Sequence, residues 1–342
     1  MDVDPNAIVR VPVADLQAVA VRALTRHGAR VDEAAVQARH LIEGDMRHMP
    51  SHGVRRLGTL IRRMQVGLVN IAAHSTLNWE RPAVVAVDGD NGFGPVVAYR
   101  ALDALIERSA QTGVALAAIQ HAHHLGMLSP YTERTAAQGA IGVVLTTSEA
   151  LVHPWGGRGA LVGTNPLSIG VPSSAGPVVL DMSTAAATAG AIIDHAARGA
   201  RLPVGWAVDA EGRPTLDADE AIAGAISPFG GAKGFALGLT LEALVGLTTH
   251  AAYGVDVAGT LDHHRPVSKG DLLIVISLEA LGADPNDLGL AGYLDIIRDS
   301  GIGGERVRIP GDRARAARAE SAAIGVPLDP AVWAATIELA GA

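Results

Sequence analysis

The sequence places a serine, a histidine and an arginine within six residues, and these side chains suit a site that binds and protonates a small anion. Ser51, His52 and Gly53 are consecutive, and Arg56 follows shortly after. Apolar residues over 57–64 recur at helical spacing, so Ser51 is predicted to cap a helix with His52 and Arg56 on one face. A carboxylate held by Arg56 would then lie beside an imidazole that exchanges a proton. The alternative interpretation is structural, with Ser51 as a simple cap and both other side chains in solvent.

A second group of imidazoles follows a predicted strand. His121, His123 and His124 come after the strand-like run 114–119, a position where α/β proteins commonly place functional side chains. Alternate side chains of an extended loop point in different directions, and no acidic residue lies at a familiar zinc-ligand spacing. The sequence therefore predicts functional side chains here but no metal site.

Two further patterns resemble known motifs but lack essential parts. Gly92-Phe93-Gly94 begins like a dinucleotide fingerprint, yet Pro95 follows at once and the third glycine is absent. Any nicotinamide cofactor must therefore be held by an architecture other than a Rossmann loop. Ser51, His52 and the distant Asp181 could form a hydrolase triad, but the Gly-x-Ser-x-Gly elbow is missing. A relay that recharges His52 as a proton donor is easier to build.

Composition excludes several classes of protein. The 342 residues are 49% hydrophobic and 18% charged, which suits a compact enzyme and not a disordered chain. The net charge of -8 and the lack of a basic cluster argue against a nucleic-acid partner. With no cysteine, disulfides, thiolate nucleophiles and cysteine-ligated metals are excluded. We see no signal peptide or membrane span and expect a soluble cytoplasmic protein.

The rest of the chain supplies the elements that must position these residues. We predict a mixed α/β fold with a largely antiparallel central sheet and flanking helices. Residues 1–75 are expected to form a helical part that packs with C-terminal helices in 307–342, and 76–306 to form the sheet region that binds cofactor and substrate. The clearest predicted elements are helices over 96–109 and 234–247, strands over 114–119, 141–146 and 178–180, and a last helix starting at Asp329-Pro330.

Taken together, the ordered segments resemble the malate/L-lactate dehydrogenase family, whose fold is not of the Rossmann type. That family includes sulfolactate, ureidoglycolate and diketogulonate oxidoreductases and the piperideine- or pyrroline-2-carboxylate reductases. The match is colinear over nearly the whole chain. The matching residues are Ser51-His52-Gly53 with Arg56, His124-Leu125-Gly126, Gly163-Thr164-Asn165-Pro166, Asp181-Met182-Ser183-Thr184, Gly205-Trp206-Ala207, Gly230-Gly231-Ala232-Lys233-Gly234, and Gly303-Gly304-Glu305-Arg306 with Arg308-Ile309-Pro310-Gly311.

The resemblance implies reversible hydride transfer between NADH or NADPH and the carbon beside a carboxylate, at either a C=O or a C=N bond. In ketone-reducing relatives the histidine that matches His124 is the acid/base. In imine-reducing relatives a relay is credited to the residues that match Ser51, His52 and Asp181. Arg56 would bind the substrate carboxylate. This sequence keeps both sets.

The resemblance also implies where the cofactor binds and that the protein is a homodimer. The net charge and the lack of a long apolar segment predict no nucleic-acid or membrane partner. Backbone amides beside glycines and a helix N-terminus are suited to phosphate. The candidate cofactor-binding residues are Ser148, Asp181, Met182, Ser183, Lys233, Gly303, Gly304, Glu305 and Arg306.

Three departures from the family pattern make the substrate open. His121 stands where relatives commonly have asparagine, and Ala185 and Ala191 replace a serine and a lysine. His121 could supply a proton or a specificity contact to the substrate, or do neither. The leading function is thus oxidoreduction of a 2-oxo or 2-hydroxy acid, with a 2-imino acid as the alternative. Two alternatives from other functional classes are a hydrolase and a non-catalytic binding protein.

Overall fold

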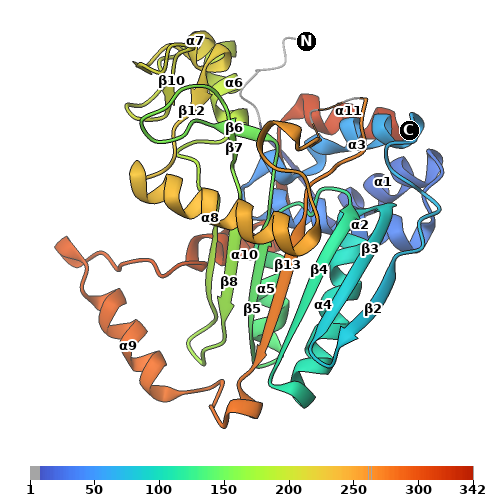
Figure 1. Ribbon diagram of the computed structural model, residues 1–342, viewed down its shortest axis with the longest axis vertical. Helices are drawn as coiled ribbons and strands as arrows, with labels where there is room; N and C mark the ends of the chain where they lie inside the picture. Colours follow the sequence, from blue (N-terminus) through green and yellow to red (C-terminus); the bar gives the residue numbers. More distant parts are fainter. Residues whose placement is uncertain (1–7, 261, 263, 342) are drawn as a thin grey trace.

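The computed structural model describes residues 8–260, 262 and 264–341 (Figure 1). Its α-helices are α1 Val13–Arg26, α2 Val31–Met46, α3 Leu57–Gln65, α4 Gly94–Thr112, α5 Ser129–Ala137, α6 Ala189–Ala197, α7 Ala218–Ala223, α8 Ala232–Thr249, α9 Leu288–Asp299, α10 Asp312–Ile324 and α11 Pro330–Ala340. Single 3-10 turns are η1 Pro50–His52, η2 Val54–Arg56, η3 Gly254–Asp256, η4 Glu279–Leu281 and η5 Ile302–Gly304. The strands are β1 Val9–Val11, β2 Thr76–Arg81, β3 Val84–Gly92, β4 Val114–Ala122, β5 Ala140–Thr146, β6 Ala150–Val152, β7 Val162–Gly163, β8 Leu167–Val171, β9 Val178–Met182, β10 Ala207–Val208, β11 Pro214–Thr215, β12 Ala225–Ile226, β13 Asp271–Ser277 and β14 Val326–Leu328.

The central sheet has seven strands in the order β2-β3-β4-β13-β5-β8-β9. The β3 and β4 strands pair in parallel, joined by α4, and every other neighbouring pair in this sheet is antiparallel. Inserting β13 between β4 and β5 brings residues more than a hundred positions apart to one end of the sheet. The predicted mixed, largely antiparallel sheet with flanking helices is confirmed.

Both faces of the sheet are packed, as alternation along β13 shows. Leu273 and Val275 point into a core with α4 and α5, whereas Leu272 and Ile274 join a cluster with Leu241 of α8. Figure 1 shows α8 crossing in front of the strands, with α4 and α5 behind them. The sheet therefore lies between α8 on one face and α4 and α5 on the other.

The N- and C-terminal segments form a helical part of their own. Strand β1 pairs with β14, and buried side chains of α1, α2, α3 and α11 share one hydrophobic cluster with them. Asp329 caps α11 through the Ala331 amide, and Pro330 occupies its first turn, as predicted. A smaller five-stranded sheet in the order β11-β10-β12-β6-β7 packs with α6 and α7 elsewhere in the chain.

Two local predictions differ from the structure. Ser51 lies inside the 3-10 turn η1 and does not cap a helix, because Pro50 starts that turn and α3 begins only at Leu57. The strand predicted over 114–119 extends to Ala122, so His121 lies in β4 and not in the following loop. None of the helices in the described part of the chain is both long and apolar enough to cross a membrane.

Candidate functional site

Helix α2 holds the turn that carries Ser51, His52 and Arg56. Asp45 lies near the end of α2, and its Oδ2 accepts a hydrogen bond from the Val54 amide at 2.7 Å. Gly53 must lack a side chain, since its Cβ would lie 1.9 Å from Asp45 Oδ1. Burial raises the pKa of Asp45 to about 7. A buried carboxyl group thus fixes the backbone that carries the predicted anion-binding residues.

The side chains of this turn contact one another. Ser51 Oγ lies 3.1 Å from Nδ1 of His52. The Arg56 Nε donates to the Ser51 carbonyl at 2.5 Å, and its NH1 lies 3.4 Å from the hydroxyl of Thr260. Arg56 is half-buried and no carboxylate is hydrogen-bonded to it in the described part of the chain, so its outer N–H groups suit an anionic ligand.

His124 lies in the loop after β4, and its backbone neighbours determine its tautomer. The Gly126 amide donates to Nδ1 of His124 at 3.0 Å. A nitrogen that accepts a hydrogen bond carries no proton, so the neutral ring has its proton on Nε2. Gly94 packs against this loop, because a Cβ there would lie 2.4 Å from the His124 carbonyl oxygen. His124 therefore presents an N–H donor from its outer nitrogen.

The structure brings His52 and His124 together. Their ring centroids are 5.9 Å apart and the ring planes differ by 23°. Burial, and then the positive charge of Arg56, lowers the pKa of His52 to about 4. The pKa of His124 is also well below its usual value, through burial first and then through Arg56, His52, Lys269 and His123. Two neutral imidazoles beside one guanidinium can bind a carboxylate and exchange a proton with its neighbouring group.

Other side chains around this centre were not found from the sequence. Lys269 is buried and its Nζ lies 2.5 and 2.6 Å from the two carboxylate oxygens of Asp271. Arg63, which is fully buried in α3, donates to Nε2 of His123 at 3.0 Å and to the carbonyl of Asp262. These two cations lie near the histidines. The Ser-His-Arg spacing and the histidines after the predicted strand gave local signals in the sequence, whereas Lys269 and Arg63 gave none.

Two predicted site residues have partners outside this centre. Asp181 accepts a hydrogen bond from the Ser129 amide at 2.7 Å, at the N-terminus of α5. His121 is exposed in β4, and its Nδ1 lies 3.0 Å from Asp88 Oδ2. No hydrogen bond joins either residue to His52 or His124 within the described residues.

Several predicted cofactor-binding residues lie in turns at the ends of strands or at the start of α8. Ser148 Oγ contacts Thr164 Oγ1 at 3.0 Å, and Met182 ends β9 directly before the turn that contains Ser183. Lys233 is exposed in the first turn of α8, whose N-cap residue Gly231 offers no side chain to the first amides. The start of α8 therefore has backbone N–H groups and a cation suited to phosphate.

The remaining predicted cofactor-binding residues lie between α9 and α10. Gly303 and Gly304 both have positive φ, and a Cβ at either position would meet no atom of the described residues within 4 Å. Glu305 is exposed, and Arg306 pairs with Asp299 at 3.0 Å. The backbone here is open to a ligand, whereas the charge of Arg306 already has an acidic neighbour.

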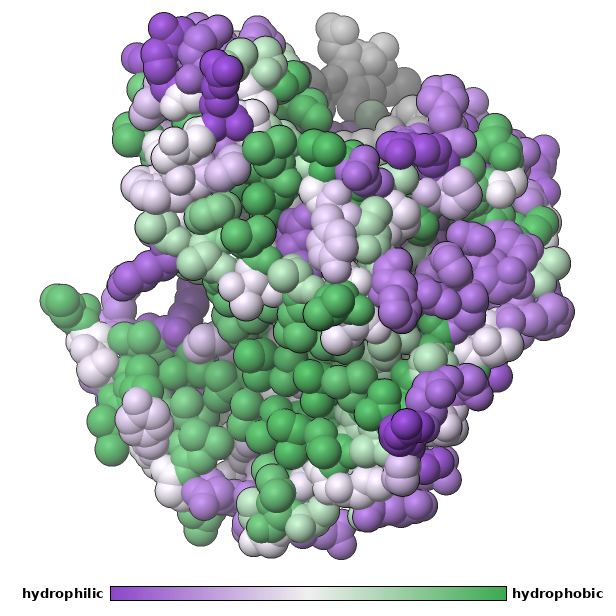
Figure 2. Space-filling model, in the orientation of Figure 1, coloured by the Kyte–Doolittle hydropathy of each residue, from purple (hydrophilic) through white to green (hydrophobic). Residues whose placement is uncertain are grey.

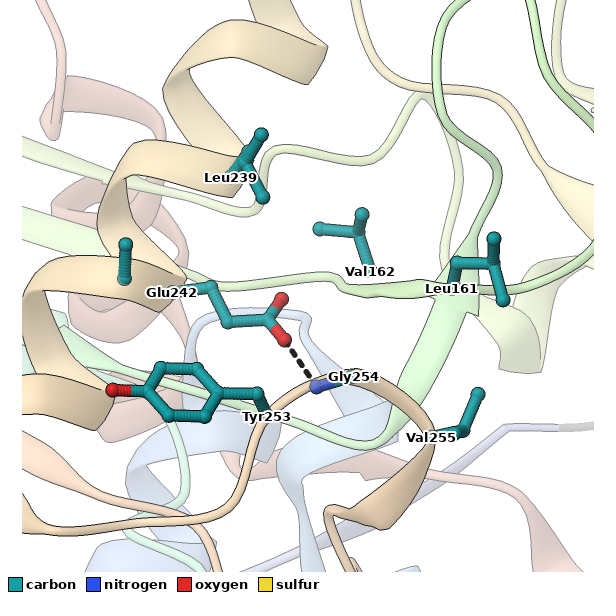
Figure 3. A pocket seen from close by; sticks show the side chains of 8 residues that line it. Leu161, Val162, Leu239, Glu242, Tyr253, Gly254 and Val255 are labelled. Carbon is teal, nitrogen blue, oxygen red and sulfur yellow. Dashed lines mark hydrogen bonds between the residues drawn. The ribbon is translucent and has the colours of Figure 1, made fainter.

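A separate cavity of about 320 Å³ lies between α8 and η3. Its lining is apolar except for Glu242, which accepts hydrogen bonds from Gly163 and Gly254 amides, the latter drawn in Figure 3. It contains none of the predicted site residues. Among the described residues no group of three or more histidine, aspartate or glutamate side chains could hold a metal ion.

The mixed α/β architecture brings paired imidazoles and an arginine together, side chains that are suited to acid/base chemistry on a carboxylate. Comparisons with known proteins identify the family. The sequence profile described as malate/L-lactate dehydrogenase matches residues 11–336. The chain therefore belongs to the malate/L-lactate dehydrogenase family.

Individual relatives include both dehydrogenases and imine reductases. L-sulfolactate dehydrogenase of Methanothermobacter thermautotrophicus is 34% identical over 84% of each chain. Delta(1)-pyrroline-2-carboxylate reductase 1 of Burkholderia ambifaria is 35% identical over 93% of this chain and 94% of the relative. The crystal structure of a dehydrogenase from Sinorhizobium meliloti superposes with a TM-score of 0.92 and 43% identity, covering 99% of this chain and all of that one.

Proposed function

We propose that this protein is an NAD(P)H-dependent oxidoreductase that transfers a hydride to or from the α carbon of a 2-oxo or 2-hydroxy acid. The observation that carries the proposal is the stacking of His52 and His124 beside Arg56. Arg56 binds the substrate carboxylate, which places the neighbouring carbon and its oxygen next to the two rings. Family membership supports the same class of reaction.

The two histidines have different tasks in this proposal. His124 is a neutral Nε2–H donor, since its Nδ1 already accepts the Gly126 amide. It hydrogen-bonds to the substrate oxygen and stabilises negative charge there. We assign the proton to His52 and not to His124, the acid/base that the resemblance to ketone-reducing relatives implies, because Nε2 of His124 already carries a proton. Ser51 Oγ can either donate to or accept from Nδ1 of His52 and so allows both protonation states.

Proton transfer balances the hydride transfer. In oxidation, the substrate hydroxyl gives its proton to Nε2 of His52 as the C=O bond forms, and reduction reverses this step. The low pKa of His52 in the free protein suits its role as a base. A substrate carboxylate on Arg56 offsets the positive charge that lowers this pKa, so binding prepares His52 to hold a proton for reduction.

The residues present fit a nicotinamide cofactor, which supplies or accepts the hydride when bound. The open amides at the start of α8 and Lys233 would hold its phosphates. Ser148, Asp181, Met182 and Ser183 would line the cofactor site between the sheets. Gly303, Gly304, Glu305 and Arg306 would contribute the exposed backbone between α9 and α10.

Reduction of a cyclic or linear 2-imino acid is the alternative. The 3.1 Å contact between Ser51 and His52 supports it, because this pair would protonate the imine nitrogen in the relay that the family resemblance implies. The resemblance includes Asp181 in that relay, although in the described residues its hydrogen bond comes from the Ser129 amide and not from Ser51 or His52; His121 would contact the substrate.

A substrate screen with matched variants tests the function. We would follow nicotinamide absorbance with malate, sulfolactate, Δ1-pyrroline-2-carboxylate and Δ1-piperideine-2-carboxylate, each with the NADH and NADPH couples. We expect His52→Gln to lower kcat roughly 100- to 10,000-fold, because glutamine cannot carry the proton. His124→Leu is expected to lose roughly 100- to 1,000-fold, whereas His124→Gln keeps an N–H donor and most of that activity.

The outcome separates the alternatives. A chain that is inactive with every acid and causes no change in nicotinamide fluorescence would exclude the proposed function. Full activity of both His52→Gln and His124→Leu would exclude the assigned roles. Preference for the imino acids would select the alternative reaction.

We also propose a homodimer in the cytoplasm, with a small carboxylate as substrate. Apolar residues gather over α8 and the sheet beside it (Figure 2). Leu239, Leu244 and Leu247 of α8 are exposed, and so are Tyr253 and Val255 nearby. A helix that is apolar all round is suited to burial, and a second copy of the chain would cover it.

A further inference from the structure

A buried histidine on α2 lies behind the loop that carries His124. His40 is 1% exposed, and it lies outside the cluster formed by His52 and Arg56. A Cβ at Gly126 would lie 2.5 Å from Cδ2 of His40, so the ring packs directly on the Gly126 backbone. Gly126 is the residue whose amide donates to Nδ1 of His124. His40 therefore contacts the residue whose amide sets the His124 tautomer.

The hydrogen bonds of His40 determine its own orientation. Nε2 lies 3.0 Å from the Met127 carbonyl, which can only accept, so Nε2 carries the proton. Nδ1 then accepts from the Tyr99 hydroxyl at 3.3 Å. Burial lowers the pKa of His40 to about 4, which agrees with a neutral ring. The ring has one arrangement that satisfies both neighbours.

A second aromatic residue supports the same loop. The ring of Tyr131 stacks on His40 with centroids 4.8 Å apart, and its hydroxyl donates to the Leu125 carbonyl at 2.7 Å. The carbonyls on either side of Gly126 are thus each held by one side chain from α2 or α5. Tyr131 holds the Leu125–Gly126 peptide, whose N–H contacts His124, and His40 packs on Gly126 and holds the carbonyl of the next residue. The Gly126 amide therefore has little freedom to turn away from His124.

We propose that His40 is a positioning residue for the reaction: by packing on Gly126 and binding the Met127 carbonyl, it keeps His124 as a neutral Nε2–H donor to the substrate. The inference rests on the proposed function for the role of His124 but concerns a different residue. It also has a consequence in the free protein, because the His124 tautomer is set before any ligand binds.

The test compares two variants of similar polarity. In His40→Gln the amide reaches the place of Nε2 and can donate to Met127, whereas in His40→Asn it reaches only the place of Nδ1. Nitrogen-15 NMR of histidine-labelled full-length protein would report the tautomer, with the His124 signal assigned by its loss in His124→Gln. We expect the Nε2–H pattern in the unmodified chain and in His40→Gln, and a mixture of tautomers in His40→Asn.

Kinetics with the acid that performs best in the screen supply a second readout. We expect His40→Asn to lower kcat roughly 10- to 100-fold while KM changes less than about threefold, and His40→Gln to recover most of kcat. An Nε2–H pattern that persists in His40→Asn overturns the inference, whatever its effect on thermal stability. Equal loss of kcat in both variants also overturns it.

Two controls keep the result interpretable. Tyr99→Phe removes the hydroxyl donor to His40 without opening a large cavity, and we expect a smaller shift of the same His124 signal. If His40→Asn does not fold, an unchanged signal in Tyr99→Phe overturns the inference. Should His124→Leu keep full activity, the catalytic role assigned to His124 fails while the NMR result still decides whether His40 sets its tautomer. A chain that is inactive with every acid would instead exclude the proposed function.

Discussion

At the scale of single residues, the positive charge of Arg56 affects the protonation of the histidines around it. Its guanidinium lowers the pKa of His52, His123 and His124, each after the larger effect of burial. Glu149 partly offsets this charge, as its effect on the pKa of Arg56 shows. Because the histidines are neutral, the free site is cationic and is complementary to a carboxylate.

Replacing Arg56 tests substrate capture. We expect Arg56→Gln to raise KM for the acid substrate roughly 10- to 100-fold, because a charge-assisted hydrogen bond is lost. The effect on kcat should be smaller, since the guanidinium contacts the carboxylate in ground and transition states alike. Initial-rate kinetics would measure both constants. Arg55→Gln is the matched control, because that neighbouring side chain is exposed, and an equal rise of KM in the control would contradict the prediction.

Asp45 gives a pH-dependent prediction for stability. Its pKa is raised from 3.8 to about 7 by burial, so between these values the folded chain keeps a proton that the unfolded chain releases. The contribution of Asp45 to stability therefore falls as pH rises from about 4 to 7 and is level above that.

Asp45→Asn removes this dependence while keeping an acceptor for the Val54 amide. Relative to the unmodified chain, its free energy of unfolding should rise between pH 5 and 7 by up to about 1.4 kcal/mol per pH unit. Urea denaturation of both proteins at pH 5 and pH 8 measures the difference. A difference that is the same at both pH values would show that Asp45 does not hold this proton.

At the scale of elements, motifs of consecutive residues could be predicted from the sequence. The side chains that pack against these motifs from distant segments could not. The turn with Ser51 and His52 and the loop with His124 each gave a local pattern. The strands over 140–146 and 178–182 contain the predicted strands 141–146 and 178–180. His40 and Lys269 gave no such signal. Their roles depend on α2 packing behind the loop and on β13 inserting between β4 and β5, which no local spacing encodes.

Local competition explains the wrong helix cap. Pro50 and Gly53 favour tight turns, and the Asp45 carboxyl group satisfies the Val54 amide in place of Ser51. The serine hydroxyl is thereby left to contact His52. The contact from Asp45 of α2 to the Val54 amide thus replaces the local cap, and the Ser51 hydroxyl remains available for the proposed proton transfer.

The start of α8 gives a prediction for cofactor binding. We expect Lys233→Gln to weaken NAD(P)H binding roughly 2- to 5-fold, since an exposed cation contributes modestly to phosphate binding. The effect should shrink as salt is raised. Fluorescence titration would measure it, with Arg62→Gln as a control because Arg62 is exposed on a different helix, α3. Unchanged affinity at low salt would place the phosphates elsewhere.

At the scale of the whole molecule, we propose that the chain divides into a helical part and a sheet part. Pairing of β1 with β14 joins the two ends of the chain, and their side chains share a core with α1 and α2. We retain residues 1–75 with 307–342, and 76–306, as the proposed division. His52 belongs to the first part and His124 to the second, so the proposed centre lies where the two parts meet.

The exposed leucines of α8 give a prediction for assembly. Leu247 is 74% exposed, and a charge at that position would oppose burial against a second copy. We expect Leu247→Glu to lower the mass in sedimentation equilibrium from twice the chain mass to a single chain. Val66→Glu is the control, since Val66 is 61% exposed after α3. A dimer that persists in Leu247→Glu would show that copies associate through another surface.

The contact of Gly94 with the His124 loop limits how relatives can exchange segments. The start of α4 approaches the His123 and His124 carbonyls so closely that a methyl group would not fit. Gly94 is one of the two glycines that resemble a fingerprint for a dinucleotide, and it is required by the backbone of this loop; at the other, Gly92, a Cβ would lie 2.7 Å from Ala73 Cβ. In a chimera that exchanges only loop 123–128, the new loop would have to fit the existing contacts with Gly94 and with His40 of α2. A chimera that exchanges 92–128 together with α2 would keep these contacts within one parent sequence.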